Sequence, residues 1–281
     1  FRPVSHYFRQ NFSQVTNPPI DSLRENKVMS LKTRFGNLGN ILDFDNLTEE
    51  NIYVLDSPIL TNSQFKKFKK FFSKKAKTID CTFKISSSLK ARIEEIREEA
   101  ETSVRQGSTC IVLSDKNITD QNASIPSILT VGAVHSHLVK HGLRGYCSLN
   151  VECSDALDTH SFAVLIGVGA TTVNPYLAID SIYQRFEKKL FGKSDFESCV
   201  LKFKKSIDAG LLKIMSKMGI SVISSYRGGC NFEAVGLSRA IVSDYFSGMS
   251  SRISGIGVIG IEKKIKELHE KFNAKNVFTL P

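Results

Sequence analysis

The amino-acid sequence predicts an α/β fold in which strands alternate with helices and form a mainly parallel sheet. One observation is the alternation itself: segments 108–113 and 149–153 are short apolar runs typical of buried strands, and helical patterns lie between them. The other is segment 196–237, where a long amphipathic helix precedes a β-branched run and a Gly-Gly turn. A helix, strand, loop, helix unit of this kind is the building block of an α/β domain.

The first elements lie between residues 51 and 113. Segments 51–56 and 78–85 have the composition of strands, and segments 64–77 and 88–104 have the spacing of helices. Ser88 is placed to accept a hydrogen bond at the start of the second helix. With the buried strand at 108–113, these elements give the strand, helix, strand order of an α/β domain.

The helix expected at 64–77 is strongly basic. Phe65, Phe68 and Phe72 share one helical face, and seven lysines surround it. Lysines and aromatic rings together can bind nucleic acid. However, the spacing predicts that the rings are buried in one stripe, so none remains to stack on a base, and the lysines form a solvated face. We therefore predict no nucleic-acid partner.

The elements after residue 113 continue the same pattern. The longest helix should end at Gly219, because glycine readily adopts the left-handed conformation that terminates helices, and Lys217 favours the negative end of the helix dipole. Asn231 is placed to cap a further helix that carries Phe232, Val235 and Leu237. The expected helices are 128–141, 159–167, a segment ending at 191, 196–218, 237–246 and 262–272, the expected strands are 149–153, 172–178 and 220–226, and the expected loop is 248–260.

Composition limits the class of protein. The 281 residues carry a formal charge of +10 and fit one large or two small domains. No apolar run reaches the roughly 18 residues of a membrane span, so we expect no membrane association. The six cysteines lack short paired spacings, which favours buried thiols and a cytoplasmic protein. The first residue is Phe1, so we expect a piece of a longer protein.

The chain divides into two parts by composition. Residues 1–45 contain rigid prolines at Pro18 and Pro19 and little regular periodicity, which indicates an extended segment. This segment is either a surface linker or an ordered stretch packed on neighbouring domains, and we predict the latter. Residues 46–281 then form the α/β domain.

Histidines on the helix 128–141 suggest one candidate metal site. His137 and His141 are four residues apart and share a helical face, which is the geometry of a two-histidine zinc platform. Such a site needs a third ligand, for which His160 is a candidate, and no glutamate lies between the pair as a zinc protease requires. The sequence alone therefore assigns no metal.

No familiar catalytic motif occurs in the sequence. There is no glycine-rich phosphate loop, no nucleophile elbow and no pair of carboxylates at a fixed short spacing. Gly167 and Gly169 resemble the start of a dinucleotide-binding motif, but the third glycine is missing and a helix, not a strand, precedes them. We therefore predict no catalytic residue in this chain.

Several motifs in register resemble the central domain of the glutamate synthase large subunit, and they span nearly the whole chain. They are TNPPID at 16–21, LRE at 23–25, VMSL at 28–31, GAVH at 132–135, NPYLA at 174–178, KIMSKMGI at 213–220 and FEAVGL at 232–237. The resemblance implies an α/β connector similar to a degenerate barrel. It also implies a role in an oxidoreductase that converts glutamine, 2-oxoglutarate and reducing equivalents into two glutamates.

In that family the central domain joins an amidotransferase domain to an FMN and 2-oxoglutarate domain of the same polypeptide, and it helps to wall a passage for ammonia. FMN and an iron-sulfur cluster belong to the full enzyme, with no cofactor expected in this chain. A small electron-transfer subunit or ferredoxin is an implied partner. The resemblance places Met29 toward the flavin, and it places four residues toward the passage: Thr16, Asn17, Pro18 and Asp21.

The chain departs from the family pattern at Leu157, Cys230 and Asn231. These departures leave an alternative open, in which the chain is a free-standing basic α/β binding protein or a relic that kept the fold without the activity. The basic charge would then suit an anionic ligand. A third interpretation is a self-sufficient FMN enzyme in which residues 227–229, an Arg-Gly-Gly turn at the end of a strand, bind the phosphate. The sequence does not identify the electron donor or the oligomeric state.

Overall fold

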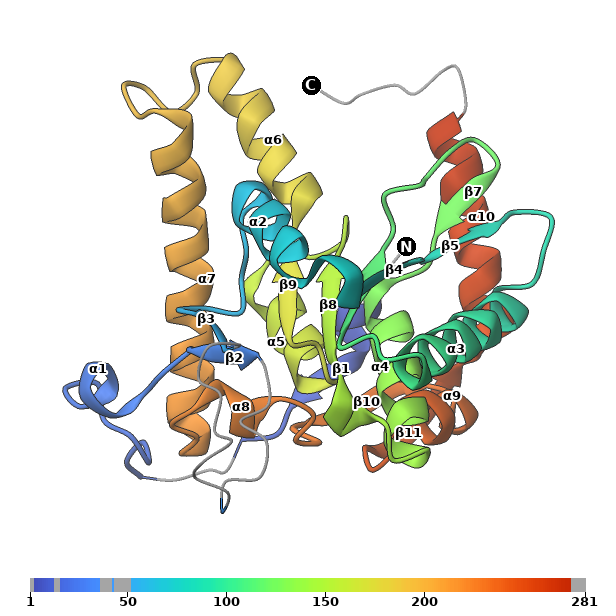
Figure 1. The fold of residues 1–281 in the computed structure, drawn as a ribbon, viewed down its shortest axis with the longest axis horizontal. Helices are drawn as coiled ribbons and strands as arrows, with labels where there is room; N and C mark the ends of the chain where they lie inside the picture. Colours follow the sequence, from blue (N-terminus) through green and yellow to red (C-terminus); the bar gives the residue numbers. More distant parts are fainter. Residues whose placement is uncertain (1–2, 13–15, 36–41, 43–51, 274–281) are drawn as a thin grey trace.

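The computed structural model describes residues 3–12, 16–35, 42 and 52–273. Its central feature is a parallel sheet of four strands in the order β4-β6-β8-β9 (Figure 1). These strands are β4 (Ala76–Asp80), β6 (Cys110–Ser114), β8 (Ser148–Glu152) and β9 (Thr172–Asn174). Ala76 pairs with Cys110 and Cys110 with Ser148, so β4, β6 and β8 start level with one another, whereas β9 starts opposite Asn150. The predicted α/β class and parallel sheet are confirmed.

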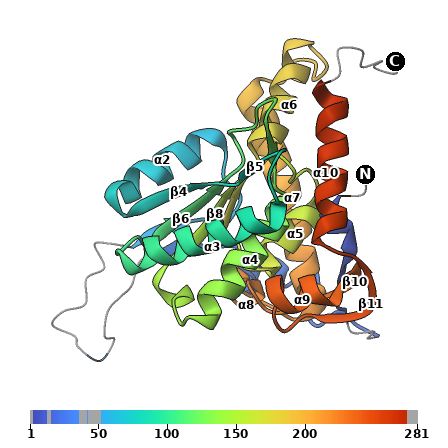
Figure 2. The same cartoon turned by 90° about the vertical axis from the view of Figure 1, so that its right-hand side faces the viewer.

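Helices cover both faces of this sheet (Figure 2). Helix α2 (Asn62–Phe72) lies on one face, and helices α3 (Leu89–Arg105), α4 (Ser127–Lys140) and α5 (Thr159–Gly167) lie on the other. The side chains of β6 alternate between the two: Cys110 and Val112 join a small cluster with the phenylalanines of α2, whereas Ile111 and Leu113 belong to the main core. Both faces are therefore apolar, as parallel strands require.

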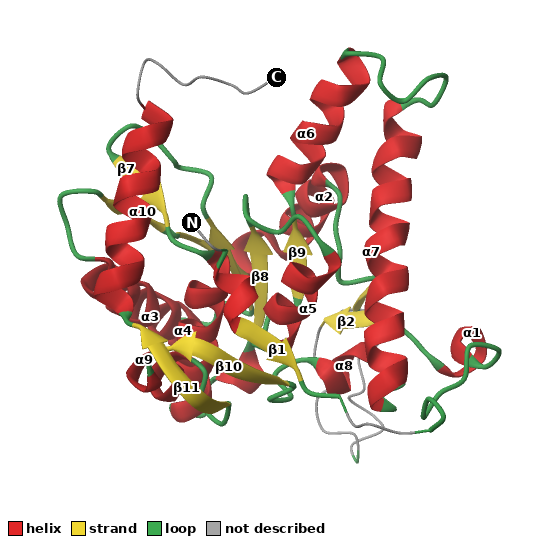
Figure 3. Cartoon of the chain, turned by 180° about the vertical axis from the view of Figure 1, so that it is seen from behind, coloured by secondary structure: helices red, strands yellow, loops and turns green. Residues whose placement is uncertain are grey.

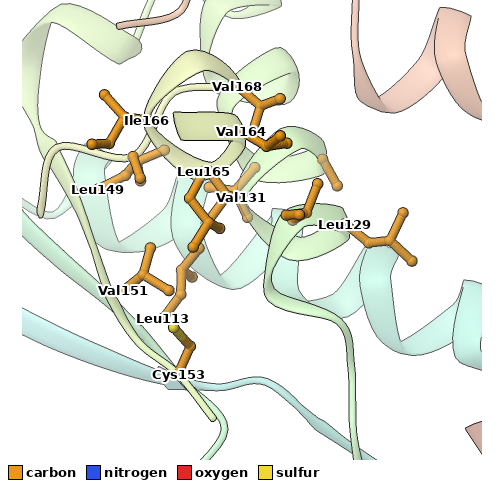
Figure 4. Packing of buried hydrophobic residues seen from close by; sticks show 14 of the residues in the cluster. Leu113, Leu129, Val131, Leu149, Val151, Cys153, Val164, Leu165, Ile166 and Val168 are labelled. Atoms are coloured by element: carbon orange, nitrogen blue, oxygen red, sulfur yellow. The ribbon is translucent and has the colours of Figure 1, made fainter. Parts of the chain in front are cut away.

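The main core lies between the sheet and the helices α3, α4 and α5. Phe162 and Leu89 are fully buried there, and α4 contributes ten buried residues. Figure 4 shows side chains of β6, β8, α4 and α5 converging on this core, including Leu113, Leu129, Val131, Leu149, Val151 and Leu165.

A second sheet of three strands lies below the first and nearer to the viewer in Figure 3. It contains β1 (Phe8–Gln10), β10 (Phe232–Leu237) and β11 (Ser250–Ile256), with β1 antiparallel and β11 parallel to β10. Helix α9 (Arg239–Tyr245) connects β10 to β11, and helix α10 (Val258–Asn273) follows β11. Two-stranded sheets are formed by β2 (Thr33–Phe35) with β3 (Tyr53–Leu55), and by β5 (Thr82–Lys84) with β7 (Asn122–Ser124).

Helices α6 (Tyr176–Glu187) and α7 (Phe196–Met218) form a hairpin that extends beyond the sheet, visible at the upper left of Figure 1. Asp195 caps α7, and Gly219 ends it with a φ of 72°. The predicted helix 196–218 and its stop are confirmed. Two short helical turns, α1 (Glu25–Val28) and α8 (Ile223–Tyr226), lie near its C-terminal end.

Several predicted elements are wrong. Segment 220–226 is not a strand: Val222 makes an isolated bridge with Ser30 and α8 follows. The residues from Phe232 form strand β10, not a helix capped by Asn231, and the expected loop at 248–260 contains β11. The helix predicted at 64–77 ends at Phe72, and the strand predicted at 78–85 divides into β4 and β5. By contrast, the short strand expected in 172–178 and ended by its proline is confirmed, because β9 ends at Asn174, directly before Pro175.

The barrel-like closure is not confirmed, because the strands of the described residues belong to four separate sheets. Within the part of the chain that the structure describes, no helix combines the length and hydropathy needed to cross a bilayer.

Candidate functional site

Ionisable side chains gather where the parallel strands end. Asp80 ends β4, Asp115 directly follows β6, Glu152 ends β8 and Asp155 follows three residues later. The carboxyl ends of parallel strands meet at one edge of a sheet, where α/β proteins usually place their binding and catalytic groups. This edge is therefore the first candidate site.

Glu152 lies on the α2 side of that edge and is paired with lysines. Its Oε1 is 2.9 Å from Nζ of Lys116 and 3.6 Å from Nζ of Lys69, and its Oε2 accepts a hydrogen bond of 2.8 Å from Ser114. Burial alone would raise the pKa of Glu152, but the hydrogen bonds from Lys116 and Ser114 outweigh burial and lower it. Glu152 is thus an ionised carboxylate, fixed by its partners.

Asp115 lies on the other side and receives several donors. Its Oδ2 accepts hydrogen bonds from Ser124 Oγ at 2.9 Å, from the Ser154 amide at 3.0 Å and from Ser154 Oγ at 2.5 Å. Its Oδ1 is buried without a hydrogen-bond partner. Burial, followed by the charge of Asp115, raises the pKa of the Tyr176 phenol. The tyrosine therefore stays neutral at physiological pH.

Cys153 and Asp155 complete this edge. Burial, followed by the charge of Asp155, raises the pKa of the Cys153 thiol well above its ordinary value. Asp155 accepts hydrogen bonds from the amide and the hydroxyl of Ser127, and burial raises its pKa. A thiol without a nearby cation is not a nucleophile at neutral pH, because thiolate formation needs a lowered pKa. The strand-end groups therefore act mainly on one another.

A cavity lies at the opposite end of the sheet from these carboxylates. A cavity of about 450 Å³ is lined by Arg105, Thr109, Leu143 and Tyr146, among others. Thr109 precedes β6, so this cavity is at the amino-terminal end of the sheet, opposite the carboxylates. The polar edge and the larger hollow are thus separate features.

The residues predicted to wall a passage lie together on one segment. Thr16, Asn17 and Pro18 are exposed. The Asp21 carboxylate is half-buried and accepts hydrogen bonds from the amides of Leu23 and Arg24 at 2.9 and 3.0 Å, which shapes the turn before α1.

Met29, predicted to face the flavin, is half-buried and packs on the main core. Main-chain hydrogen bonds hold this segment on either side of α1. The Ile20 amide donates to the Ser216 carbonyl at 3.3 Å, and the Ser30 amide donates to the Ser221 carbonyl at 2.8 Å. The whole stretch is therefore fastened beside the C-terminal end of α7.

The histidines are arranged differently from the prediction. Nε2 of His160 lies 2.9 Å from the Ser5 carbonyl, away from His137 and His141. The side chain that joins the pair is Glu101 of α3, whose Oε2 is 2.6 Å from Nε2 of His137. Glu101 was missed because no sequence pattern reports which residues of two packed helices face each other.

Two arginines form a cationic group near His135. Arg144 donates to Nδ1 of His135 at 3.1 Å and to the Gly169 carbonyl at 2.9 Å. Nε and Nη2 of Arg227 are buried without a hydrogen-bond partner, and burial, followed by the charge of Arg144, lowers the pKa of Arg227 to about 10. No carboxylate of the described residues makes an ion pair with either arginine. This group also escaped prediction.

The departures from the family pattern are accommodated. Asn231 is 8% exposed, and its Nδ2 donates to the Tyr226 carbonyl at 2.7 Å, so the buried amide has a partner. Leu157 and Cys230 are exposed, and Cys230 adopts a positive φ of 53°. None of the three leaves a visible defect in the core.

Comparison with known proteins identifies a family. A family model described as "Glutamate synthase central domain" matches residues 1–238. The "Glutamate synthase [NADPH] large chain" of Azospirillum brasilense is 54% identical over 284 residues, which cover 100% of this chain and 19% of that protein. The large chain of Bacillus subtilis is 40% identical over 95% of this chain and 17% of its own length.

The "Ferredoxin-dependent glutamate synthase" of Pyropia yezoensis is 39% identical over 94% of this chain and 18% of its own length. The chain thus spans less than a fifth of the length of these relatives. Among solved structures, a mutant flavocytochrome b2 with pyruvate bound aligns over 82% of this chain and 77% of its own, with a TM-score of 0.49 and 12% identity. That likeness is too weak to assign a barrel.

Proposed function

The chain belongs to the glutamate synthase central-domain family, and we propose that it is the domain that connects the two catalytic domains of a glutamate synthase. The complete enzyme would transfer the amide nitrogen of glutamine to 2-oxoglutarate, and this domain would help to wall the passage for ammonia. Ammonia that reaches bulk water is protonated and lost, so a closed connector aids the reaction without forming bonds itself. The flanking amidotransferase and FMN domains would be its partners.

The observation that carries the proposal is the combination of anchoring and exposure in residues 16–30. Main-chain bonds at Ile20 and Ser30 anchor the part from Ile20 to Ser30, Asn17 is exposed just before it, and Leu23 and Val28 within it are 88% and 49% exposed. An ordered strip with exposed apolar side chains is suited to contact another protein surface. In a connector, the neighbouring domains would cover it.

The arrangement at the strand ends agrees with a connector. Glu152 and Asp155 are engaged by side chains of this chain, and Cys153 and Tyr176 are held neutral. Asp115 keeps one carboxylate oxygen, Oδ1, without a hydrogen-bond partner, but neither Cys153 nor Tyr176 beside it is ionised to act as a nucleophile.

The cofactors of the complete enzyme do not fit the described residues. An iron-sulfur cluster needs several cysteine thiolates close together. Here Cys81, Cys110 and Cys153 are buried with raised pKa values, and they do not form a group of metal-ligating side chains. The loop 227–229 follows helix α8 and not a strand, so the phosphate-binding turn expected at a strand end is not formed there. Both cofactors would therefore belong to other parts of the polypeptide.

The electron donor would likewise act elsewhere. Relatives named for NADPH, ferredoxin and NADH match 100%, 94% and 96% of this chain, respectively. A domain shared by enzymes with three different donors would not be the part that selects the donor, so any small subunit or ferredoxin would dock on another domain. All six cysteines are free, which suits a cytoplasmic enzyme.

The test is the coupling of two half-reactions in the intact enzyme. Asn17→Trp should uncouple them, so that glutamine hydrolysis continues while glutamate formed per glutamine consumed falls severalfold. Met29→Trp should act in the same direction. Asn26→Trp is the matched control, because Asn26 is also exposed on the same stretch but is outside the predicted passage wall. If both Asn17→Trp and Met29→Trp kept the two half-reactions tightly coupled, the proposed role of this segment beside the ammonia passage would be ruled out.

A further inference from the structure

The C-terminal ends of α3 and α4 bring three ligand-type side chains together. Oε2 of Glu101 lies 2.6 Å from Nε2 of His137 and 3.8 Å from Nδ1 of His141. One ligand atom from each of the three lies within 4.8 Å of the other two. These atoms come from two helices, so the cluster exists only because the helices pack against each other.

The cluster is open to solvent but well supported. The side chains of Glu101, His137 and His141 are 22%, 18% and 35% exposed. Arg105 donates to the other oxygen, Oε1, of Glu101 at 2.8 Å, which leaves Oε2 facing the histidines. Arg105 and then His137 lower the pKa of Glu101, so the carboxylate is ionised at neutral pH.

An alternative explanation is an ion-pair network that only joins two helix ends. Such a network needs one histidine beside the carboxylate. The contact of His141 Nδ1 with the His137 carbonyl, at 2.9 Å, holds the second imidazole, but it does not account for the approach of the same nitrogen to Glu101 at 3.8 Å. Two imidazoles that face one carboxylate can each offer a nitrogen lone pair to a shared cation.

We propose that Glu101, His137 and His141 bind one Zn²⁺-type divalent ion that joins α3 to α4. Two histidines and one carboxylate form a common three-ligand zinc set, with water in the fourth position. Borderline-soft imidazole nitrogens favour such metals over Mg²⁺ and Ca²⁺, which prefer oxygen ligands. The ion would stabilise the helix pair, far from the carboxylate edge of the sheet.

Little rearrangement is needed for binding. With metal-ligand bonds of about 2.0–2.2 Å, tetrahedral ligands lie about 3.3 Å apart. The contact from Glu101 to His137 must therefore lengthen and the contact from Glu101 to His141 must shorten, each by less than about 1 Å. The two histidine nitrogens lie within 4.8 Å of each other and must approach to the same spacing, by up to about 1.5 Å, which side-chain rotation can supply. Nδ1 of His141 is now 2.9 Å from the His137 carbonyl, so coordination through Nδ1 requires its proton to move to Nε2.

Titration of the intact protein with ZnCl₂ tests the proposal, with bound zinc counted per polypeptide. The wild type should bind one more Zn²⁺ than His141→Gln and Glu101→Gln, or bind it at least about 100-fold more tightly. His6→Gln, which removes an exposed histidine outside the cluster, should bind as the wild type does. Other zinc sites on the polypeptide cancel in these differences.

Thermal unfolding supplies the second measurement. Zn²⁺ should raise the Tm of the wild type and of His6→Gln, because a ligand that binds only the folded state stabilises it. The increase should be lost in His141→Gln, whose side chain is partly exposed and whose Tm without zinc should match the wild type. Equal zinc affinity in wild type and His141→Gln, or equal response to MgCl₂ and ZnCl₂, would overturn the proposal.

Discussion

Nζ of Lys213 on α7 lies 2.7 Å from Oε1 of Glu25 on α1, although 188 residues separate them in sequence. Together with the main-chain bonds at Ile20 and Ser30, this ion pair fastens the exposed stretch 16–30 to the longest helix. Since α7 also packs on α5 and on the main core, the position of the stretch is set by the domain as a whole.

Glu25→Gln should loosen this stretch without unfolding the protein. The Lys213 side chain is 57% exposed, and pairs of that kind contribute about 0–1 kcal/mol, so the overall Tm should barely change. Cleavage by thermolysin next to Leu23 or Met29 should become faster, because local opening exposes them. Glu267→Gln, on an exposed glutamate of α10, is the control and should leave cleavage unchanged. Equal cleavage rates in both variants would contradict the anchoring role.

Arg97→Met should be strongly destabilising. The Arg97 side chain is 7% exposed, donates to the carbonyls of Ala133 and Asp244, and forms ion pairs with Glu94 and Asp244. Its loss leaves those groups without a donor, which should cost about 2–4 kcal/mol of unfolding free energy in urea. Arg252→Met is the control, because the Arg252 side chain is 84% exposed and should cost under about 1 kcal/mol. Similar losses of unfolding free energy in the two variants would show that the contacts of Arg97 do not hold α3 against α9.

Gly132→Ala should also destabilise the fold. A Cβ at Gly132 would lie 2.2 Å from Cε1 of Phe246 and 2.8 Å from the Tyr245 carbonyl oxygen, so α4 and α9 would have to separate. Overpacking of this kind costs about 1–3 kcal/mol. Gly145→Ala is the matched control, because nothing lies within 4 Å of its Cβ, and its Tm should stay close to that of the wild type. An unchanged Tm in Gly132→Ala would contradict the tight packing of these helices.

The sequence predicted the parallel sheet and its helices well because their signals are local. Asp158 and Asp195 cap α5 and α7, and Gly219 stops α7, so each of these helices carries its own boundary. The class α/β and the family could therefore be inferred from the sequence.

The second sheet could not be predicted, because its signals depend on tertiary contacts. Strand β11 is mostly exposed and lacks the alternation of a half-buried strand. Its Gly255 was interpreted as a loop residue, yet a Cβ there would lie 2.2 Å from the Gly236 carbonyl, so glycine permits the close pairing with β10. Similarly, the β-branched run at 220–226 resembles a strand, but Ile223 and Tyr226 are buried one helical turn apart in α8.

The candidate sites were predicted only in part: the spacing of His137 and His141 pointed to that pair, and the family motifs pointed to others. Asn17 and Met29 came from resemblance, and their role stays a prediction. Glu101 and Arg227 act through neighbours that are distant in sequence, such as His137 and Arg144. No spacing rule could have joined them.

The stability of the protein should fall in acid partly through His135. Burial, followed by the charge of Arg144, lowers the pKa of His135 from 6.5 to about 4. Between those values the unfolded chain binds a proton at this residue that the folded chain does not, so the unfolding free energy decreases as pH falls from about 6.5 to about 4. Nδ1 of His135 accepts a hydrogen bond from Arg144, which requires the neutral imidazole.

His135→Gln should therefore flatten this part of the pH dependence. The glutamine oxygen can still accept the hydrogen bond from Arg144 but does not titrate. Urea unfolding of both proteins at pH 7 and pH 5 measures the effect, and the loss between the two pH values should be smaller in the variant. Carboxylates with lowered pKa values, such as Glu152 and Asp158, contribute equally to both proteins and cancel. An identical loss in the two proteins would mean that the folded state protonates His135 as readily as the unfolded chain does.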